Sequence, residues 1–226
     1  MQENVIIKKT LSEQIYEVLI ADIICGKINL GDKLTNRELQ ERFNVSSTPV
    51  RDAINNLSRD GLLYNVTRSG AQLIDFNAQY ATQVNEFIIA LSCEALMLSA
   101  KNSSPEDVAR DLYTYQNLME TSSENSYYHY DYQYHKTFFK HSKNHFLQDA
   151  YKQVNVIRSF LFRYAIRTPD EKRFSIAQHK EITETYVAKN YKAARELLQA
   201  HLNYGLERAI DYYKQHSHVH ALNSAV

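Results

Sequence analysis

The sequence predicts a mainly α-helical protein, in which an N-terminal winged helix-turn-helix precedes an all-α antiparallel helical bundle. Helices are favoured because the 226 residues include only five Gly and three Pro, and because few stretches alternate apolar with polar residues as strands do. The winged part is expected at the start, where two short helices joined by a tight turn precede a hairpin pattern. We expect the first domain at residues 1–74, a linker at 75–79 and the bundle at 80–226.

The first expected helix begins near Thr10 and ends at Gly26, before a turn at residues 29–32. Thr10 or Ser12 can cap its N-terminus, because a hydroxyl accepts a hydrogen bond from a free backbone amide. Apolar residues at helical spacing form the stripe that we expect to be buried: Ile15, Val18, Leu19 and Ile23.

A second and a third helix follow, at residues 36–43 and 46–57, and the turn between them is Asn44-Val45. In the third helix Ser46 is a good N-cap and Pro49 lies in the first turn, where no backbone N–H is needed. One face of this helix is apolar and another is polar: Val50, Ala53, Ile54 and Leu57 against Ser47, Thr48, Arg51 and Asn55. This is the helix-turn-helix pattern, although an ordinary helical hairpin in a globular core would look similar.

A hairpin pattern directly after the third helix favours a DNA-binding domain over the ordinary hairpin. Residues 62–66 and 71–74 are strand-like, and residues 67–70 form a tip that contains Arg68 and Gly70. An ordinary helical domain is not expected to carry a small basic hairpin directly after this helix. The residues that we expect to contact DNA are Arg37, Ser46, Ser47, Thr48, Arg51, Arg68, Ser69 and Gly70.

Charge gives no global sign of a nucleic-acid partner. The formal net charge is zero, and the first 74 residues carry nine Lys and Arg against nine Asp and Glu. The attraction for DNA would therefore be local, from Arg37, Arg51 and Arg68. Cys25 and Cys93 lie in apolar helical stretches and are expected to be reduced core residues. We find no signal peptide and no apolar run of membrane-spanning length, so we expect a soluble cytoplasmic protein.

The bundle is expected to contain six helices, near residues 80–101, 105–121, 127–142, 145–167, 171–188 and 190–214. The tail after them alternates histidines at 216, 218 and 220. A metal-binding tail and a frayed, solvated end both fit this pattern, and the solvated end is favoured.

Three of the bundle helices each carry an ionisable side chain on an otherwise apolar face. Asp131 and His135 are four residues apart, so both project from one face of a helix. His179 and His201 lie in apolar stripes of two later helices. One divalent ion shared by these four residues would satisfy all of them, whereas the alternative is three separate core histidines, each bonded to a backbone carbonyl.

Residues 34–74 resemble the DNA-binding domain of the GntR family of bacterial repressors. The matching stretches are Val45 to Ile54, Asp60-Gly61-Leu62 and Gly70-Ala71, together with Gly31 to Leu34 before Arg37-Glu38-Leu39. The resemblance implies that Arg37, Thr48 and Arg51 contact DNA, and that Gly70 lets the wing enter the minor groove. Ser47 stands where the family often has Arg, so we expect a shifted operator preference.

The helical domain resembles the FCD effector domain of FadR-type members of the same family. The stretches that carry the resemblance are 131–135, 175–182 and 194–201, with a Ser142-Lys143-Asn144 turn. It implies that Asp131, His135, His179 and His201 ligate one divalent ion, and three His with one carboxylate suit Zn, Ni or Mn. Gln178 replaces the usual Glu, which we expect to leave ligation unchanged.

Residues 86–89 lack the Arg that the family often carries early in its first effector helix. Arg158 or Arg163 is the expected replacement as a cation for a carboxylate ligand.

The sequence therefore predicts a homodimeric DNA-binding repressor that reads a palindromic operator and responds to a small, carboxylate-type effector at the metal. In one alternative the ion itself is the signal. A metal-dependent hydrolase or lyase is a weaker alternative, because no carboxylate is placed to act as acid or base beside a metal-bound water. We do not expect an enzyme.

Overall fold

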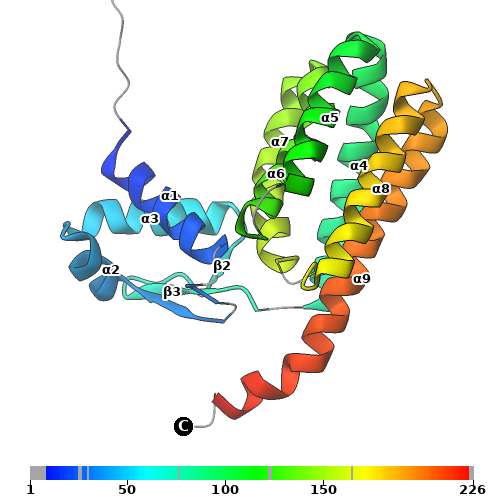
Figure 1. The fold of residues 1–226 in the computed structure, drawn as a ribbon. Helices are drawn as coiled ribbons and strands as arrows, with labels where there is room; N and C mark the ends of the chain where they lie inside the picture. Colours follow the sequence, from blue (N-terminus) through cyan, green and yellow to red (C-terminus); the bar gives the residue numbers. More distant parts are fainter. Residues whose placement is uncertain are drawn as a thin grey trace, which may run out of the picture. The chain divides into compact units, whose positions relative to one another are not determined.

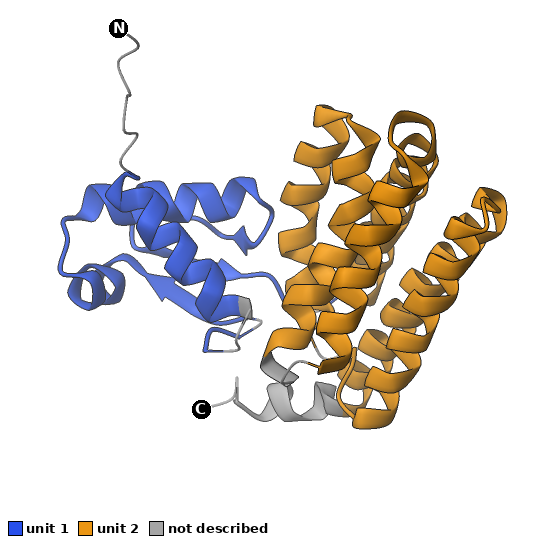
Figure 2. Ribbon diagram, turned by 45° about the horizontal axis from the view of Figure 1, so that its top comes forward, with its two compact units in different colours: residues 1–77 blue, residues 78–226 orange. Residues whose placement is uncertain are grey.

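The computed structural model describes residues 9–24, 27–29, 31–75, 77–121, 124–163 and 165–223. The chain divides into two compact units, residues 1–77 and 78–226 (Figure 1, Figure 2). The first is a small mixed α/β unit and the second is a bundle of long helices, so the mainly α-helical class is confirmed. Cys25, Gly26 and Leu30 lie outside the described residues, as do the side chains of the histidine tail.

The first unit contains α1 (Leu11–Ile24), α2 (Asn36–Phe43) and α3 (Ser47–Arg59) beside a small sheet. The sheet has the order β1-β3-β2, with β1 at Lys33–Thr35, β2 at Leu63–Tyr64 and β3 at Gly70–Leu73. Both strand pairs are antiparallel, and Leu63 pairs with Leu73 in the expected hairpin. The winged helix-turn-helix therefore has the predicted order of elements.

Local chemistry explains where the helices of this unit begin. The Thr10 hydroxyl accepts from the Glu13 amide at 3.2 Å and the Glu13 carboxylate accepts from the Thr10 amide at 2.7 Å, which is a capping box. Thr35 caps α2 with its hydroxyl, which accepts from the Glu38 amide at 3.2 Å. Ser46 occupies the N-cap position of α3 with an extended backbone, as expected. Its hydroxyl makes no capping hydrogen bond, so the predicted role of its side chain is wrong.

The apolar stripes of this unit are buried as expected, with one exception. Val50, Ala53, Ile54 and Leu57 are at most 2% exposed, and each large side chain buried in this way contributes about 1.5–3 kcal/mol. Val18 is 41% exposed and so does not belong to the α1 stripe. The buried positions of α1 are spaced by four residues, and Val18 lies on their flank.

Strand β1 was not expected from the sequence, and it explains Gly70. Three residues are too few to show alternation, and β1 is defined by its pairing with β3, in which Thr35 faces Gly70. Gly70 is buried with a φ of +151°, and a Cβ built on it would lie 2.1 Å from the Leu34 carbonyl oxygen. The strand pairing alone therefore requires glycine at this position, whatever the wing does at DNA.

The second unit consists of six helices packed side by side (Figure 2). Their bounds are α4 (Ala78–Asn102), α5 (Pro105–Thr121), α6 (Glu124–Ser142), α7 (His145–Leu161), α8 (Pro169–Val187) and α9 (Tyr191–Asn223). Thr168 and Glu171 form the capping box that begins α8, with Pro169 in its first turn. Helix α9 runs on through the histidine tail, so its backbone is not the frayed end that we expected.

Helix α7 ends six residues earlier than the expected residue 167, because a tertiary contact replaces its last helical hydrogen bonds. The Tyr128 hydroxyl donates to the Ile166 carbonyl at 2.7 Å and accepts from the Ile166 amide at 3.3 Å. This contact holds the chain in a non-helical turn before α8. Propensity alone gives no sign of it.

Helix α4 is, within the described residues, the one helix long and apolar enough to cross a membrane, contrary to our reading of the sequence. It is a core helix of the bundle. Its buried face includes Cys93, which is a free thiol as expected, and also the polar side chains of Asn85, Ser92 and Ser99.

We predict that Gly70→Ala destabilises the first unit by at least about 2 kcal/mol, because the added Cβ meets backbone that cannot move aside. Thermal unfolding of the full chain, followed by circular dichroism, measures the change. Gly31→Ala is the control: its φ is +78° but a Cβ there meets nothing within 4 Å, so only the smaller backbone cost applies. Equal unfolding temperatures for the two variants would contradict the steric explanation.

Candidate functional site

The first candidate site lies on the polar face of α3. The buried stripe of this helix packs on the core, and this packing leaves Thr48, Arg51 and Asn55 exposed and Ser47 half-exposed. The asymmetry is a consequence of sequence spacing, since the polar residues lie outside the apolar stripe. A helix that is dry on one face and polar on the other has side chains available for a partner.

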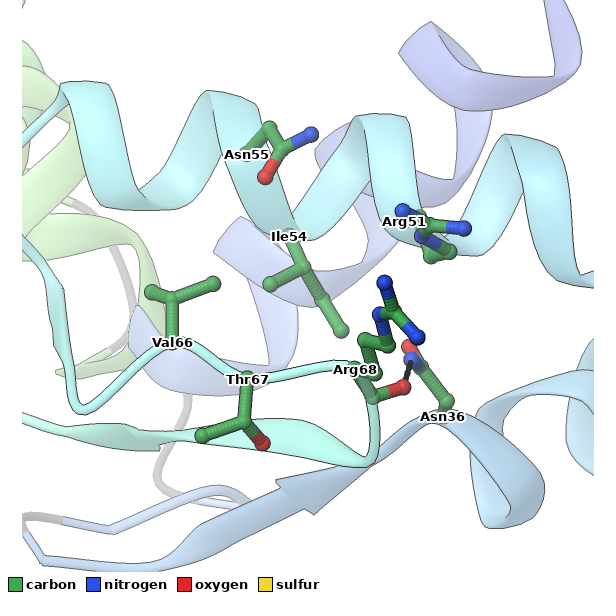
Figure 3. A pocket seen from close by; sticks show the side chains of 7 residues that line it. All are labelled: Asn36, Arg51, Ile54, Asn55, Val66, Thr67 and Arg68. Carbon is green, nitrogen blue, oxygen red and sulfur yellow. Dashed lines mark hydrogen bonds between the residues drawn. The ribbon is translucent and has the colours of Figure 1, made fainter.

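An open hollow of about 350 Å³ lies between α3 and the loop that joins β2 to β3. Figure 3 shows Arg51 on α3 and Arg68 on the loop, on either side of this hollow and near Asn36. The remaining lining residues are Ile54, Asn55, Val66 and Thr67. Two guanidinium groups beside a concave surface attract anions, and the structure brings the polar face of α3 and the basic loop together around this hollow.

The wing is held in place by Asn36, a residue that the sequence did not single out. Its side-chain amide donates to the Arg68 carbonyl, and its backbone amide donates to the Ser69 carbonyl at 2.8 Å. Within the tip, Thr67 and Ser69 hydroxyls lie 2.9 Å apart and the Thr67 amide donates to the Gly70 carbonyl at 2.8 Å. The first residue of α2 therefore fixes the position of Arg68 relative to α3.

The other residues expected at DNA differ in their surroundings. Arg37 is 89% exposed and forms an ion pair with Glu41 at 2.9 Å. Ser46 and Ser69 are exposed, whereas Gly70 is buried against β1.

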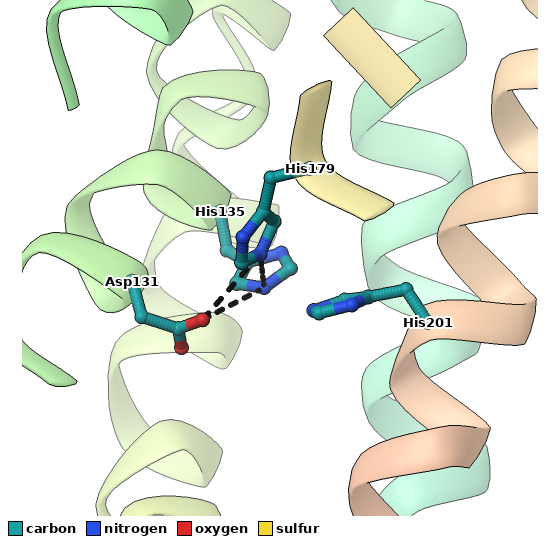
Figure 4. A group of neighbouring side chains, drawn as sticks. All are labelled: Asp131, His135, His179 and His201. Atoms are coloured by element: carbon teal, nitrogen blue, oxygen red, sulfur yellow. Dashed lines mark hydrogen bonds and ion pairs between the residues drawn. The ribbon is translucent and has the colours of Figure 1, made fainter. Parts of the chain in front are cut away.

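The second candidate site lies inside the bundle, where α6, α8 and α9 each contribute side chains. The ligand atoms of Asp131, His135, His179 and His201 all lie within 4.8 Å of one another. Figure 4 shows the three imidazoles and the carboxylate pointing toward one point, with His201 approaching from α9 opposite Asp131. The four residues that the sequence singled out are therefore one cluster, and the alternative of separate core histidines does not hold.

The spacing of three of the four ligand atoms is close to that of a tetrahedral metal site, and the four together span up to 4.8 Å. Two nitrogens bound to one ion at about 2.05 Å in a tetrahedron lie about 3.3 Å apart. The Nε2 atoms of His135 and His179 are 3.3 Å apart, and Asp131 Oδ1 is 3.4 Å from His179 Nε2 and 3.8 Å from His135 Nε2.

The protonation states of the four side chains also suit metal binding. Burial lowers the pKa of His201 to about 3, and burial together with the neighbouring imidazole of His201 holds the pKa of His135 and of His179 well below the usual value. Burial also raises the pKa of Asp131 to about 6, against the opposing effect of Arg158. Near pH 7 the cluster therefore offers three neutral imidazoles and a carboxylate, which are the forms that bind metal.

The outer nitrogens of the three imidazoles are not equivalent. His201 Nδ1 lies 3.1 Å from Gln178 Oε1. Nδ1 of His135 and Nδ1 of His179 are buried and have no hydrogen-bond partner among the described residues. No pattern in the sequence points to a contact between Gln178 and His201, because only the packing of α8 on α9 brings the two side chains together.

Of the two arginines expected near an effector, the structure places Arg158 at the cluster. Its Nη1 atom is 4.0 Å from Asp131 Oδ2, and its side chain is 12% exposed. Its Nε atom is buried without a hydrogen-bond partner in the described part of the chain. The Arg163 guanidinium lies over the Phe160 ring, 5.3 Å from its centre.

Comparison with known families gives two matches that together cover both units. Residues 11–73 match the family described as "Bacterial regulatory proteins, gntR family", and residues 83–204 match the FCD domain. The second match alone covers more than half of the chain.

Individual relatives are regulators of the same kind. The uncharacterized HTH-type transcriptional regulator YdhC of Bacillus subtilis is 25% identical over 199 residues, which are 86% of this chain and 88% of that protein. The HTH-type transcriptional repressor RspR of Escherichia coli is 42% identical over 53 residues, or 24% of this chain and 23% of RspR. The solved structure of E. coli McbR/YncC has the same fold, with a TM-score of 0.76, 19% identity and coverage of 91% of this chain and 100% of that one.

Proposed function

Because the chain belongs to the GntR family of bacterial transcriptional regulators and carries an FCD domain, we propose that it is a repressor whose operator binding responds to a small molecule at a metal-containing pocket. The families and relatives that it matches are transcriptional regulators and not enzymes. As a DNA-binding regulator it is expected to act in the cytoplasm.

The observation that carries the DNA-binding part is the polar surface shared by α3 and the wing. In a winged helix-turn-helix the second helix of the motif enters the major groove and side chains near its N-terminus reach base edges. Thr48 and Arg51 are exposed at this end of α3, and Arg68 lies across the hollow from Arg51. We therefore assign base contacts to Thr48 and Arg51, and backbone or minor-groove contacts to Arg37 and the wing.

We predict that Arg51→Ala weakens binding to the protein's own operator by about 5- to 150-fold, the cost of one lost base contact. The operator is first found by footprinting on genomic fragments, and affinity is then measured by fluorescence anisotropy at fixed salt. Arg59→Ala is the matched control, because it removes the same charge from the other end of α3. The assignment fails if both variants bind as the parent does, or if both lose affinity equally.

A palindromic operator requires two copies of the domain, and α4 offers a surface for pairing. This apolar helix has a buried face in the bundle core, but Phe87 and Met97 on its other side are 49% and 38% exposed. Ala90 is exposed between them. Regulators of this family are typically dimeric, and exposed large apolar side chains on a long helix are typical of an interface between subunits. The same face of α4 also carries the exposed carboxylates of Glu86 and Glu94.

We predict that Phe87→Asp converts the dimer to a monomer, because the new carboxylate would have to be desolvated at the interface. Light scattering coupled to size-exclusion chromatography gives the mass. Phe146→Asp serves as the control, since Phe146 is 89% exposed at the start of α7 and is not on the α4 face. If the Phe87→Asp protein remained a dimer, the interface would not be the exposed face of α4.

The effector part of the proposal depends on the cluster in the bundle. The four ligand residues would hold one divalent ion of the Zn, Ni or Mn type. The ion would supply a Lewis-acidic point to which the oxygens of a small carboxylate bind. Arg158, buried beside Asp131, would pair with the remaining negative charge of that molecule. A ligand that binds better to one arrangement of the dimer than to another then shifts operator affinity.

We predict that Zn²⁺ stabilises the folded protein, by about 2.7 kcal/mol when the ion is present at 100 times its dissociation constant. His179→Ala should lose this stabilisation, because His179 is fully buried at the centre of the cluster. Thermal unfolding with and without the ion measures the effect. His129→Ala, an exposed histidine on α6, is the control and should respond as the parent does. No shift in the parent protein would exclude the metal site.

A second candidate is a metal sensor, in which the ion alone is the signal. The presence of four potential ligand residues in one cluster favours it, because four protein ligands can complete a tetrahedral shell. Operator affinity of the apo and metal-loaded protein separates the two functions. A sensor changes affinity with the ion alone, whereas an effector-responsive repressor changes it only when a carboxylate is added to the loaded protein.

A further inference from the structure

One imidazole of the cluster is held by a hydrogen bond from outside it. His201 Nδ1 is 3.1 Å from the amide oxygen of Gln178, a residue of α8 that is itself half-buried. This contact joins α8 to α9 directly beside His179, the ligand that follows Gln178 in the chain. The outer nitrogens of His135 and His179 have no such partner among the described residues.

The chemistry of the pair decides which nitrogen of His201 can bind metal. A neutral imidazole carries one proton, on Nδ1 or on Nε2, and only the nitrogen without the proton can donate a lone pair. An amide oxygen only accepts hydrogen bonds, so Gln178 Oε1 draws the proton to Nδ1. Nε2, the other ring nitrogen of His201, is then free to coordinate.

We propose that Gln178 is a positioning residue of the metal centre, which selects the Nδ1–H tautomer of His201 and fixes the orientation of its ring. This inference rests on the metal site of the proposed function. It differs from our expectation that the side chain at 178 has no effect on ligation. Partners that hold the second nitrogen of a ligating histidine typically change metal affinity by 10- to 100-fold when they are removed.

A glutamine does this less firmly than a glutamate would. The amide group has a donor as well as an acceptor, and when its NH₂ faces His201 the proton of the imidazole moves to Nε2 and coordination is blocked. A carboxylate presents acceptors on both sides. Gln178→Glu should therefore bind metal at least as tightly as the parent, whereas Gln178→Leu, which has a similar volume and no acceptor, should bind about 10- to 100-fold more weakly.

The test uses the full chain and two readouts. Zn²⁺ affinity is measured by competition with a chromophoric chelator, and His179→Ala defines the background from other histidines. The tautomer of His201 is measured without metal, by long-range ¹H–¹⁵N correlation on protein labelled in its histidines. Gln153→Leu, an exposed change of the same kind on α7, is the matched control, and unfolding temperatures confirm that each variant is folded.

The proposal is supported if Gln178→Leu loses Zn²⁺ affinity and the Nδ1–H signal, while Gln178→Glu keeps both. It is overturned if Gln178→Leu retains both, or if leucine and glutamate weaken binding equally, since the shape of the side chain and not its acceptor would then matter. Should the parent bind no more Zn²⁺ than His179→Ala does, the metal part of the proposed function fails. The tautomer measurement still decides the role of Gln178 in that case.

Discussion

The cost of burying polar groups without partners is the constraint on which the second unit depends. Asp131 and three imidazoles are enclosed in a bundle whose neighbouring side chains include Tyr134, Phe138 and Leu198, all fully buried. Desolvation lowers the pKa of His135 and His179 and so keeps these imidazoles neutral. The Nδ1 atoms of the same two residues are buried without a hydrogen-bond partner among the described residues. An apolar core tolerates such a group only when something compensates for the lost water, and a shared ion, with Gln178 behind one ligand, is what the geometry fits.

The packing that surrounds the cluster also limits what can move. The Tyr134 hydroxyl donates to the His179 carbonyl at 2.9 Å and lies 3.0 Å from the Thr183 hydroxyl, so α6 and α8 are tied together beside two of the ligands. The ligands on these helices are therefore well fixed. Helix α9 brings the fourth ligand, and its contact with Gln178 is a single hydrogen bond.

In the first unit the constraint is different, because exposed polar side chains have to be held in a defined arrangement. The unit holds them with backbone contacts: Gly70 pairs closely with β1, and Asn36 holds the loop that carries Arg68. The arrangement of this polar surface is thus fixed by Asn36 and by the close packing of Gly70 on β1. Under the proposed function, a signal from the bundle would act on how two such units are presented to an operator, since the contacts above hold the polar surface within each unit.

Features set by short-range spacing could be predicted from the sequence alone. The apolar stripe of α3, the i and i+4 pair of Asp131 and His135, and the hairpin after Gly61 all follow from residues that are neighbours in the chain. His179 and His201 were singled out by their places in apolar helical stripes, and the resemblance to known regulators favoured one shared ion over separate core histidines. What tertiary structure decided was every feature that joins distant residues. Strand β1 exists through its pairing with β3, α7 ends where Tyr128 reaches Ile166, and His201 meets Gln178 across two helices. These contacts depend on the packing of separate elements, which no local pattern of residues encodes.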